Sequence, residues 1–266
     1  MSAKPAVDQR AKMLETPIPP LVCSLAVPTI ISMLVTAIYN TADTYFVSQI
    51  NTSASGAVGI VFSVMAIIQA VGFTVGVGSG SIASRLLGQN KHEEANIYAT
   101  TGVLIALVLG TTLCVCGLAD IDELMWLLGS TETIYPYAKD YAFYILLGSP
   151  IMILSFTMNN LMRWQGKANL AVFGLATGGI LNMILDPIFI FGLDMSVAGA
   201  ATATVISQSV SAAFVVWFLT KGKKSILKLS LRELKLDWKV IGPVLGLGIS
   251  AFVMVSTESI LSISFN

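Results

Sequence analysis

The stretch Asn182-Met183-Ile184-Leu185-Asp186-Pro187 places a carboxylate inside a run of apolar residues long enough to cross a membrane. An Asp at the centre of a membrane helix costs about 2.5–3.5 kcal/mol, so a cavity, an ion or a proton is expected to compensate its charge. Pro187 cannot donate to the carbonyl of Met183, which predicts a kink there and a freed oxygen. Asn182 lies one turn before Asp186 on the same face. These groups together predict an oxygen-lined cation site or a proton relay.

The composition of the whole chain indicates an all-α polytopic membrane protein. Of the 266 residues, 55% are hydrophobic and 11% are charged, and the mean hydropathy is +0.80. Soluble domains usually contain about 25% charged residues, more than twice this fraction. The net charge of zero gives no reason to expect a nucleic-acid partner. A single histidine, His92, and three cysteines favour neither a histidine metal site nor a disulfide framework, and we expect no cofactor.

Apolar segments of about 20 residues, bounded by polar or turn residues, predict seven membrane spans. These spans are Leu21–Ile50, Ala57–Leu87, Ile97–Leu118, Tyr135–Met162, Ala168–Leu193, Val197–Thr220 and Val240–Asn266. Pro28, Pro150 and Pro187 are candidate kink positions. Residues 1–20 form a polar tail before the first span, and residues 221–239 form a basic linker between the sixth and seventh.

The positive charges predict the orientation of the chain. Of the 15 Lys and Arg residues, only Lys139 falls on the side opposite the N-terminus. The positive-inside rule therefore predicts a cytoplasmic N-terminus in a multi-pass plasma (inner) membrane protein. In the linker, Leu227, Leu231, Leu234 and Trp238 repeat at helical spacing beside basic residues, which fits either an amphipathic helix on the membrane surface or a solvated linker.

The second span contains a small residue at every fourth position. These residues are Gly72, Gly76, Gly80, Ser84 and Gly88. Such a stripe lets another helix approach closely. We therefore expect this span to pack against a neighbour over most of its length.

Two acids lie at the same predicted depth. Asp43 and Asp186 each precede the outer end of their span by seven residues, which places both about 10 Å below the outer boundary. Thr204 and Tyr141, on inward-running spans, fall at a similar level. If the two carboxylates approach each other, one should hold a proton, or a bound Na⁺ should relieve their repulsion. The alternative is that both are hydrogen-bonded packing residues.

Other polar groups could support such a site. Tyr39 and Asn40 lie within a turn of Asp43, and Glu258 is a third acid, in the seventh span. Three further amide side chains, Asn159, Asn160 and Gln208, are expected to bond between helices rather than to bind ligands.

These residues carry a resemblance to a known family. Tyr39-Asn40-Thr41-Ala42-Asp43 and Asn182–Pro187 resemble the multidrug and toxic compound extrusion (MATE) family, as do Arg85–Gly88, Gly199–Thr204 and Gly248-Ile249-Ser250. The resemblance covers nearly all of the chain from Pro17 onward. It implies a secondary active efflux antiporter that exports cationic or amphipathic compounds in exchange for H⁺ or Na⁺ by alternating access.

The resemblance also implies roles for particular residues. Asp43, Asn182, Asp186 and Thr204 match the cation-coupling site of the N-terminal lobe, and they would bind the metal ion if coupling is to Na⁺. Glu258 matches a seventh-span acid found in some members. Residues 21–220 then correspond to the six-helix N-terminal lobe, 221–239 to the linker between lobes, and 240–266 to the start of an incomplete second lobe. The expected partners are drug-like or cationic molecules, the lipid bilayer and a C-terminal lobe in cis.

Members of this family have twelve spans, and this chain supplies seven. We expect a fragment rather than a chain that pairs with a second copy, because the sequence stops within a span.

Three other functions are considered. A lipid-linked oligosaccharide flippase of the same superfamily generally has more basic residues in its cavity, and an intramembrane aspartyl protease requires a Gly-x-Gly-Asp motif that is missing here. A seven-helix receptor conflicts with the predicted cytoplasmic N-terminus and with the lack of a lysine in the seventh span. The protein is therefore not expected to be an enzyme.

Overall fold

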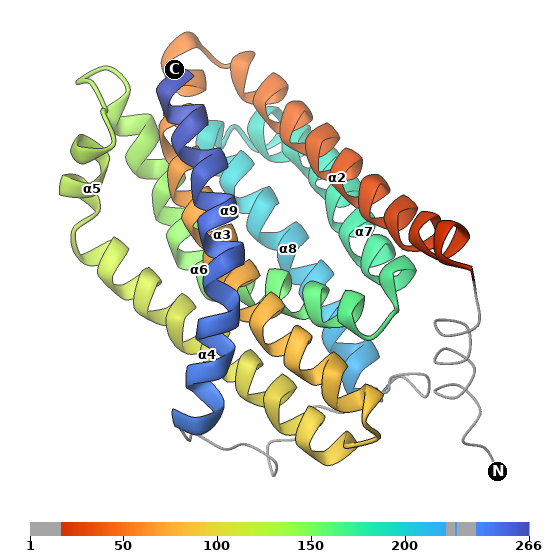
Figure 1. Ribbon diagram of the computed structural model, residues 1–266. Helices are drawn as coiled ribbons and strands as arrows, with labels where there is room; N and C mark the ends of the chain where they lie inside the picture. Colours follow the sequence, from red (N-terminus) through yellow and green to blue (C-terminus); the bar gives the residue numbers. More distant parts are fainter. Residues whose placement is uncertain (1–16, 222–226, 228–237, 266) are drawn as a thin grey trace.

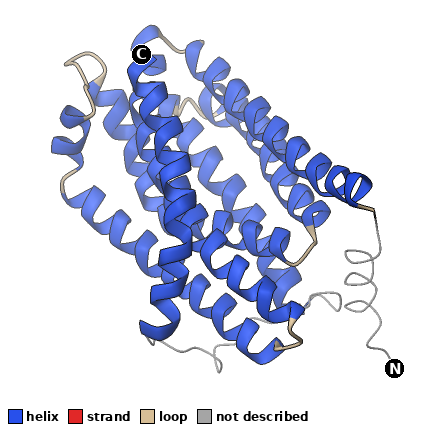
Figure 2. Ribbon diagram, viewed as in Figure 1, coloured by secondary structure: helices blue, strands red, loops and turns tan. Residues whose placement is uncertain are grey.

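The computed structural model describes residues 17–221, 227 and 238–265, apart from the side chains of Leu21, Ser24, Leu25, Thr220, Lys221 and 258–265. All the elements in these residues are helices, with no strand among them (Figure 2). They are α2 (Ile18–Ser48), α3 (Thr52–Gly88), α4 (His92–Ala119), α5 (Ile121–Leu127), α6 (Tyr135–Trp164), α7 (Ala168–Pro187), the π-helix η1 (Ile188–Gly192), α8 (Ser196–Lys221) and α9 (Trp238–Phe265). The predicted all-α class is confirmed. The predicted tail lies mostly outside the described residues, as does nearly all of the linker.

Six of the described helical segments are long and apolar enough to cross a membrane. They correspond to the second through seventh predicted spans, with bounds that agree to within a turn or two. The predicted first span forms α2, which has 31 residues. One element was not predicted: the segment after α4, expected to be a loop, contains the short helix α5.

The helices form a bundle in which α3 and α6 occupy the middle (Figure 1). Helix α3 packs against α4, α6 and α9, and α6 packs against α4 and α8 as well. Helices α2 and α7 lie side by side, and α7 also packs on α8. As a result, α2, α6, α7 and α8 can present side chains to one another at the centre of the bundle.

The stripe of small residues on α3 faces α6, so the predicted close approach of another helix is confirmed, with α6 as the neighbour. A Cβ atom added at Gly72 would lie 2.7 Å from the Cβ of Phe156, and one added at Gly76 would lie 2.8 Å from the Cβ of Asn160. Both distances are shorter than van der Waals contact allows, so the two backbones approach closely because these positions are glycine. The stripe ends before Gly88, which has no neighbour within 4 Å.

The three prolines within the spans behave differently. Pro28 and Pro150 lie inside continuous α-helices. At Pro150, the Ser149 hydroxyl donates to the carbonyl of Leu146 at 2.8 Å, which supplies a partner to the oxygen that the proline ring leaves without an amide donor. Pro187 ends α7, and the chain continues as η1, where the amide of Leu193 donates to Ile188 five residues earlier. The break predicted at Pro187 thus takes the form of a π-turn.

Candidate functional site

Polar side chains from four helices meet in the interior of the bundle. Asp43 comes from α2, Tyr141 from α6, Asn182 and Asp186 from α7, and Thr204 from α8. All five are buried: Asp186 and Tyr141 have no exposed surface, and Asp43 is 7% exposed. We call this set the carboxylate cluster. The sequence places its members far apart along the chain, and the packing of α2, α6, α7 and α8 brings them together.

Asn182 joins the α7 and α8 parts of the cluster. Its Nδ2 donates to Oδ1 of Asp186 at 3.0 Å and to Oγ1 of Thr204 at 3.3 Å. The first bond spans one turn of α7, as the four-residue spacing predicts. The second bond crosses to α8, so one amide fixes the position of the carboxylate and of the neighbouring helix.

Tyr141 joins the α2 and α6 parts. Its hydroxyl donates to Oδ2 of Asp43 at 3.3 Å and lies 3.9 Å from the sulfur of Met65. The two carboxyl groups of the cluster, Asp43 and Asp186, are close enough to interact electrostatically with each other and with Tyr141. Two negative charges at this depth repel strongly, because the surrounding apolar groups screen them poorly. A proton or a cation held between them would relieve that repulsion.

Several oxygens of the cluster accept no hydrogen bond from any described residue. They are Oδ1 of Asp43, Oδ1 of Asn182 and Oδ2 of Asp186, and each of these atoms is buried. Buried acceptors are almost always paired, and leaving one unpaired costs about 1–3 kcal/mol. Every unpaired atom in the cluster is an acceptor, so the species that completes it chemically is a donor or a cation.

A small polar cavity adjoins the cluster between α2, α7 and α8. Asn182 and Thr204 line it together with Tyr39, Ser207 and Gln208. The space open to the centres of water molecules is about 10 Å³, enough for about one water molecule. The Ser207 hydroxyl is also buried without a partner among the described residues. A water molecule or small cation therefore has polar ligands at the edge of the cluster.

Of the predicted supporting residues, some lie at the carboxylate cluster and others do not. Tyr39 lines the small cavity and Tyr141 bonds Asp43, so both lie at the cluster. Asn40 is half-buried and borders a separate, open hollow with Thr41, Thr44 and Tyr45. Glu258 lies in α9, but its side chain is outside the described residues.

The amides predicted to bond between helices have mixed outcomes. Asn159 donates to the carbonyl of Ala171 on α7 at 3.0 Å, and Gln208 accepts from Ser155 of α6 at 3.1 Å, as predicted. The prediction for Asn160 is wrong, because it donates to Phe156 of its own helix at 3.0 Å. Sequence reasoning missed Ser207. Its spacing of three residues after Thr204 could have placed it on the same face of α8.

The ligand types limit which cation the cluster could hold. No group of three or more His, Cys, Asp or Glu side chains gathers among the residues that the structure describes. The cluster instead offers two carboxylates, one amide oxygen and the hydroxyls of Tyr141 and Thr204. Hard oxygen ligands of this kind suit an alkali cation or a proton rather than a thiolate- or imidazole-bound transition metal.

A buried carboxylate cluster inside a bundle of membrane-length helices defines a polytopic membrane protein of the transporter type. The MatE family model matches residues 28–188, which include Asp43, Tyr141 and Asn182–Asp186. The chain belongs to the MatE family. The resemblance to MATE transporters predicted from sequence is thereby confirmed.

Individual relatives agree with this assignment. The chain is 28% identical over 242 residues to the multidrug export protein MepA of Staphylococcus haemolyticus, covering 91% of this chain and 53% of the relative. It is 30% identical over 209 residues to an FAD transporter of Shewanella oneidensis, covering 77% of this chain and 46% of the relative. The chain thus spans about half the length of these relatives. These proteins are named as an exporter and a transporter, so the prediction that this protein is not an enzyme is confirmed.

Solved structures show the same fold. A structure described as the outward-facing conformation of a multidrug resistance MATE family transporter superimposes with a TM-score of 0.87 at 29% identity, covering 98% of this chain and 56% of that one. The similarity runs through the whole described bundle, α9 included, because almost all of this chain is covered. The protein is therefore a multi-pass membrane protein of the MATE type.

Proposed function

We propose that this chain forms the N-terminal lobe of a secondary active multidrug antiporter. The transporter would export cationic or amphipathic compounds in exchange for H⁺ or Na⁺. The observation that carries the proposal is the carboxylate cluster, in which two buried acids from α2 and α7 retain acceptor oxygens with no donor among the described residues. In a family whose members include multidrug exporters, such a cluster supplies the ion-binding half of an exchange cycle.

The proposed cycle uses the contacts of the cluster. Binding of H⁺ or Na⁺ at Asp43 and Asp186 would neutralise the two carboxylates. The repulsion between the carboxylates of α2 and α7 would then be removed. The hydrogen bond between Asp43 and Tyr141 would also change. A ligand shifts a conformational equilibrium only by its differential affinity for the two states. The cluster provides this difference if α2 packs differently when Asp43 is neutral.

The proposal includes an orientation and a location. We infer that the N-terminus is cytoplasmic and that the protein resides in the plasma (inner) membrane, because nearly all of the Lys and Arg residues lie on the same side of the predicted spans as the N-terminus. With this orientation, the cluster lies in the outer half of the bundle. The substrate cavity would form between this lobe and a C-terminal lobe in cis.

Substitution of Asp43 tests the proposal. Asp43→Asn, made in the complete reading frame that contains this sequence, should abolish efflux of a cationic dye from cells that lack their own exporters. The matched control is Asp194→Asn, the same chemical change at an exposed residue after η1, where an Asn tolerates the positive φ of 55°. Unimpaired efflux by Asp43→Asn, at equal membrane abundance, would refute the proposal.

A relative named as an FAD transporter gives a second candidate substrate class. FAD carries negative phosphates, whereas the charged side chains of the cluster are acidic, so we favour cationic compounds. Proteoliposomes offered either labelled FAD or a cationic dye separate the two. Transport of FAD alone would replace the multidrug assignment while leaving the ion-coupling role of Asp43 to be tested independently.

A further inference from the structure

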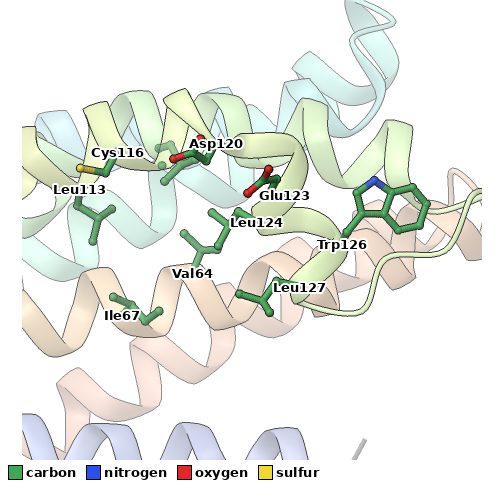
Figure 3. A pocket seen from close by; sticks show the side chains of 11 residues that line it. Val64, Ile67, Leu113, Cys116, Asp120, Glu123, Leu124, Trp126 and Leu127 are labelled. Carbon is green, nitrogen blue, oxygen red and sulfur yellow. The ribbon is translucent and has the colours of Figure 1, made fainter.

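A second cavity lies away from the carboxylate cluster and shares no residue with it. It is a groove of about 740 Å³ between α3, α4 and α5 (Figure 3), and Leu146 of α6 also lines it. Pockets that bind small organic molecules usually measure about 300–1,000 Å³. The walls are mainly aliphatic and include Val64, Ile67, Leu113 and Leu146. The ion-coupling proposal gives this groove no role.

The charged groups of the groove lie together where α4 gives way to α5. Asp120 and Glu123 lie along one edge, with Val64 across from them and Ile67 nearer Leu113 (Figure 3). Asp120 follows the last residue of α4, a helix long and apolar enough to span a membrane, and Glu123 lies in α5. The part of the groove beside these two acids is therefore expected at the boundary between hydrocarbon and headgroups.

An aromatic pair marks the same level. The indole of Trp126 stacks on the ring of Tyr135, with centroids 5.2 Å apart and an interplanar angle of 14°. Trp and Tyr are enriched where membranes meet water. Next to Trp126, Leu127 borders the groove and is 83% exposed, so the apolar lining continues outward to the exposed surface.

The two acids of the groove have no cationic partner in the described part of the chain. Their neighbour Asp122 pairs with Lys139, but Asp120 and Glu123 are exposed and form no ion pair there. An occupant that complements the groove thus has a cationic head at one end and an apolar chain at the other. Charged groups gathered at one place, with mainly aliphatic walls elsewhere, match the polarity of a lipid better than that of a drug with dispersed polar groups.

We propose that the groove holds an acyl chain of a bilayer phospholipid whose headgroup bears an ammonium, with the ammonium beside Asp120 and Glu123. Phosphatidylethanolamine meets this description, whereas the anionic phosphatidylglycerol would be repelled by both carboxylates. Exposed ion pairs contribute little, so the two together predict a modest selectivity of about two- to tenfold. This site does not depend on ion coupling at Asp43.

Trp126 can report which lipid occupies the groove. Within residues 1–266, the changes Trp164→Phe, Trp217→Phe and Trp238→Phe leave Trp126 as the only tryptophan, and any tryptophan that the complete reading frame encodes elsewhere is also changed to Phe. This variant is reconstituted in vesicles of equal parts phosphatidylethanolamine and phosphatidylglycerol, with bromine on the chains of one lipid or of the other. The bulk composition is identical, so the ratio of the two quenching constants measures selectivity. We expect stronger quenching by the brominated ethanolamine lipid, by about two- to tenfold, and equal quenching would overturn the proposal.

Acid substitutions then locate the selectivity. The double variant Asp120→Asn/Glu123→Gln should bring the quenching ratio to about one. Glu132→Gln, which removes an exposed acid that does not line the groove, should leave the ratio unchanged. A ratio that survives the double variant would overturn the assignment of these two acids.

A second reporter covers the case in which the single-tryptophan variant does not fold. Cys116 lines the groove and is exposed, and a fluorophore attached there, with Cys23→Ser and Cys114→Ser, can be quenched by the same brominated lipids. Selectivity for the ethanolamine lipid at Cys116 would support the proposal. Relief of quenching by aqueous tetraphenylphosphonium, without lipid selectivity, would overturn it in favour of a soluble organic cation.

Discussion

The hydroxyl of Tyr141 on α6 donates to Oδ2 of Asp43 on α2 at 3.3 Å, with both side chains buried. Hydrogen bonds to charged groups contribute about 1.5–3 kcal/mol. If Asp43 binds the coupling ion, Tyr141→Phe should lower efflux about tenfold at a fixed ion gradient, because the carboxylate loses the donor that orients it. The measurement is the initial rate of dye efflux from loaded cells.

The matched control for this prediction is Tyr144→Phe. Tyr144 lies on the same helix, is partly buried and packs edge-on against Phe143. It should retain parental efflux, since it bonds neither carboxylate of the cluster. Equal losses in the two variants would indicate a general packing effect and would contradict the role given to the Tyr141–Asp43 bond.

Asn182 should be more important for stability than the hydroxyl it contacts. Asn182→Leu removes the donor to both Asp186 and Thr204, and each buried acceptor left unpaired costs about 1–3 kcal/mol. Thr204→Val removes only the second bond and keeps the volume. We expect a clearly larger fall in Tm for Asn182→Leu than for Thr204→Val, measured by thermal unfolding in detergent. A larger loss in Thr204→Val would show that the amide is not the central bridge.

The response to an imposed ion gradient identifies the coupling ion and tests whether it binds at the carboxylate cluster. Proteoliposomes are loaded with dye on the side from which it is exported. Either a pH gradient or a Na⁺ gradient of equal size is then applied. If two carboxylates share the bound ion, Asp186→Asn should abolish the response to whichever gradient drives the parent. A variant that retains half or more of that response would exclude Asp186 from the coupling site.

Much of the cluster could be predicted from the sequence because depth follows from counting residues along a span. Asp43 and Asp186 each precede the end of a span by the same number of residues, and helices have a fixed rise. This rule placed both acids at one level before any packing was known. The hydrogen bonds of Tyr141 and Thr204 are consistent with that level.

What the sequence could not supply is which face of each helix meets which neighbour. Asn40 lies only three residues before Asp43, yet it borders a different hollow, because α2 is covered by α7 on one side only. Asn160 faces α3 at Gly76, yet its amide bonds to Phe156 of its own helix. Helix α5 escaped prediction because seven residues are too few for a periodic pattern to be distinguished from a loop.

The ion pair between Asp122 and Lys139 should give a small, pH-dependent contribution to stability. The hydrogen bond from Lys139, with a second one from Tyr135, holds the pKa of the Asp122 carboxyl below its ordinary value. A carboxyl whose pKa is lowered by folding stabilises the protein above its ordinary pKa of about 3.9, and the contribution is lost as pH falls through the lowered value.

Both side chains of this pair are largely exposed, so the effect of its removal should be slight. Asp122→Asn should lower Tm by no more than about 2 °C at pH 7 and low salt, and less in 1 M NaCl. Asp140→Asn is the control, as an exposed acid that forms no ion pair with a described residue. A loss for Asp122→Asn that is insensitive to salt would contradict an electrostatic origin.

The close packing of α3 on α6 predicts that added volume is tolerated at one glycine of α3 and not at another. At Gly76, a Cβ atom would lie 2.8 Å from the Cβ of Asn160 and 3.1 Å from backbone atoms of Thr157, so Gly76→Val must push the two helices apart. At Gly59, on the same helix, no atom lies within 4 Å of an added Cβ. Overpacking typically costs about 1–3 kcal/mol. Gly76→Val should therefore unfold several degrees below Gly59→Val in detergent, and equal Tm values would show that the α3–α6 contact is looser than these distances indicate.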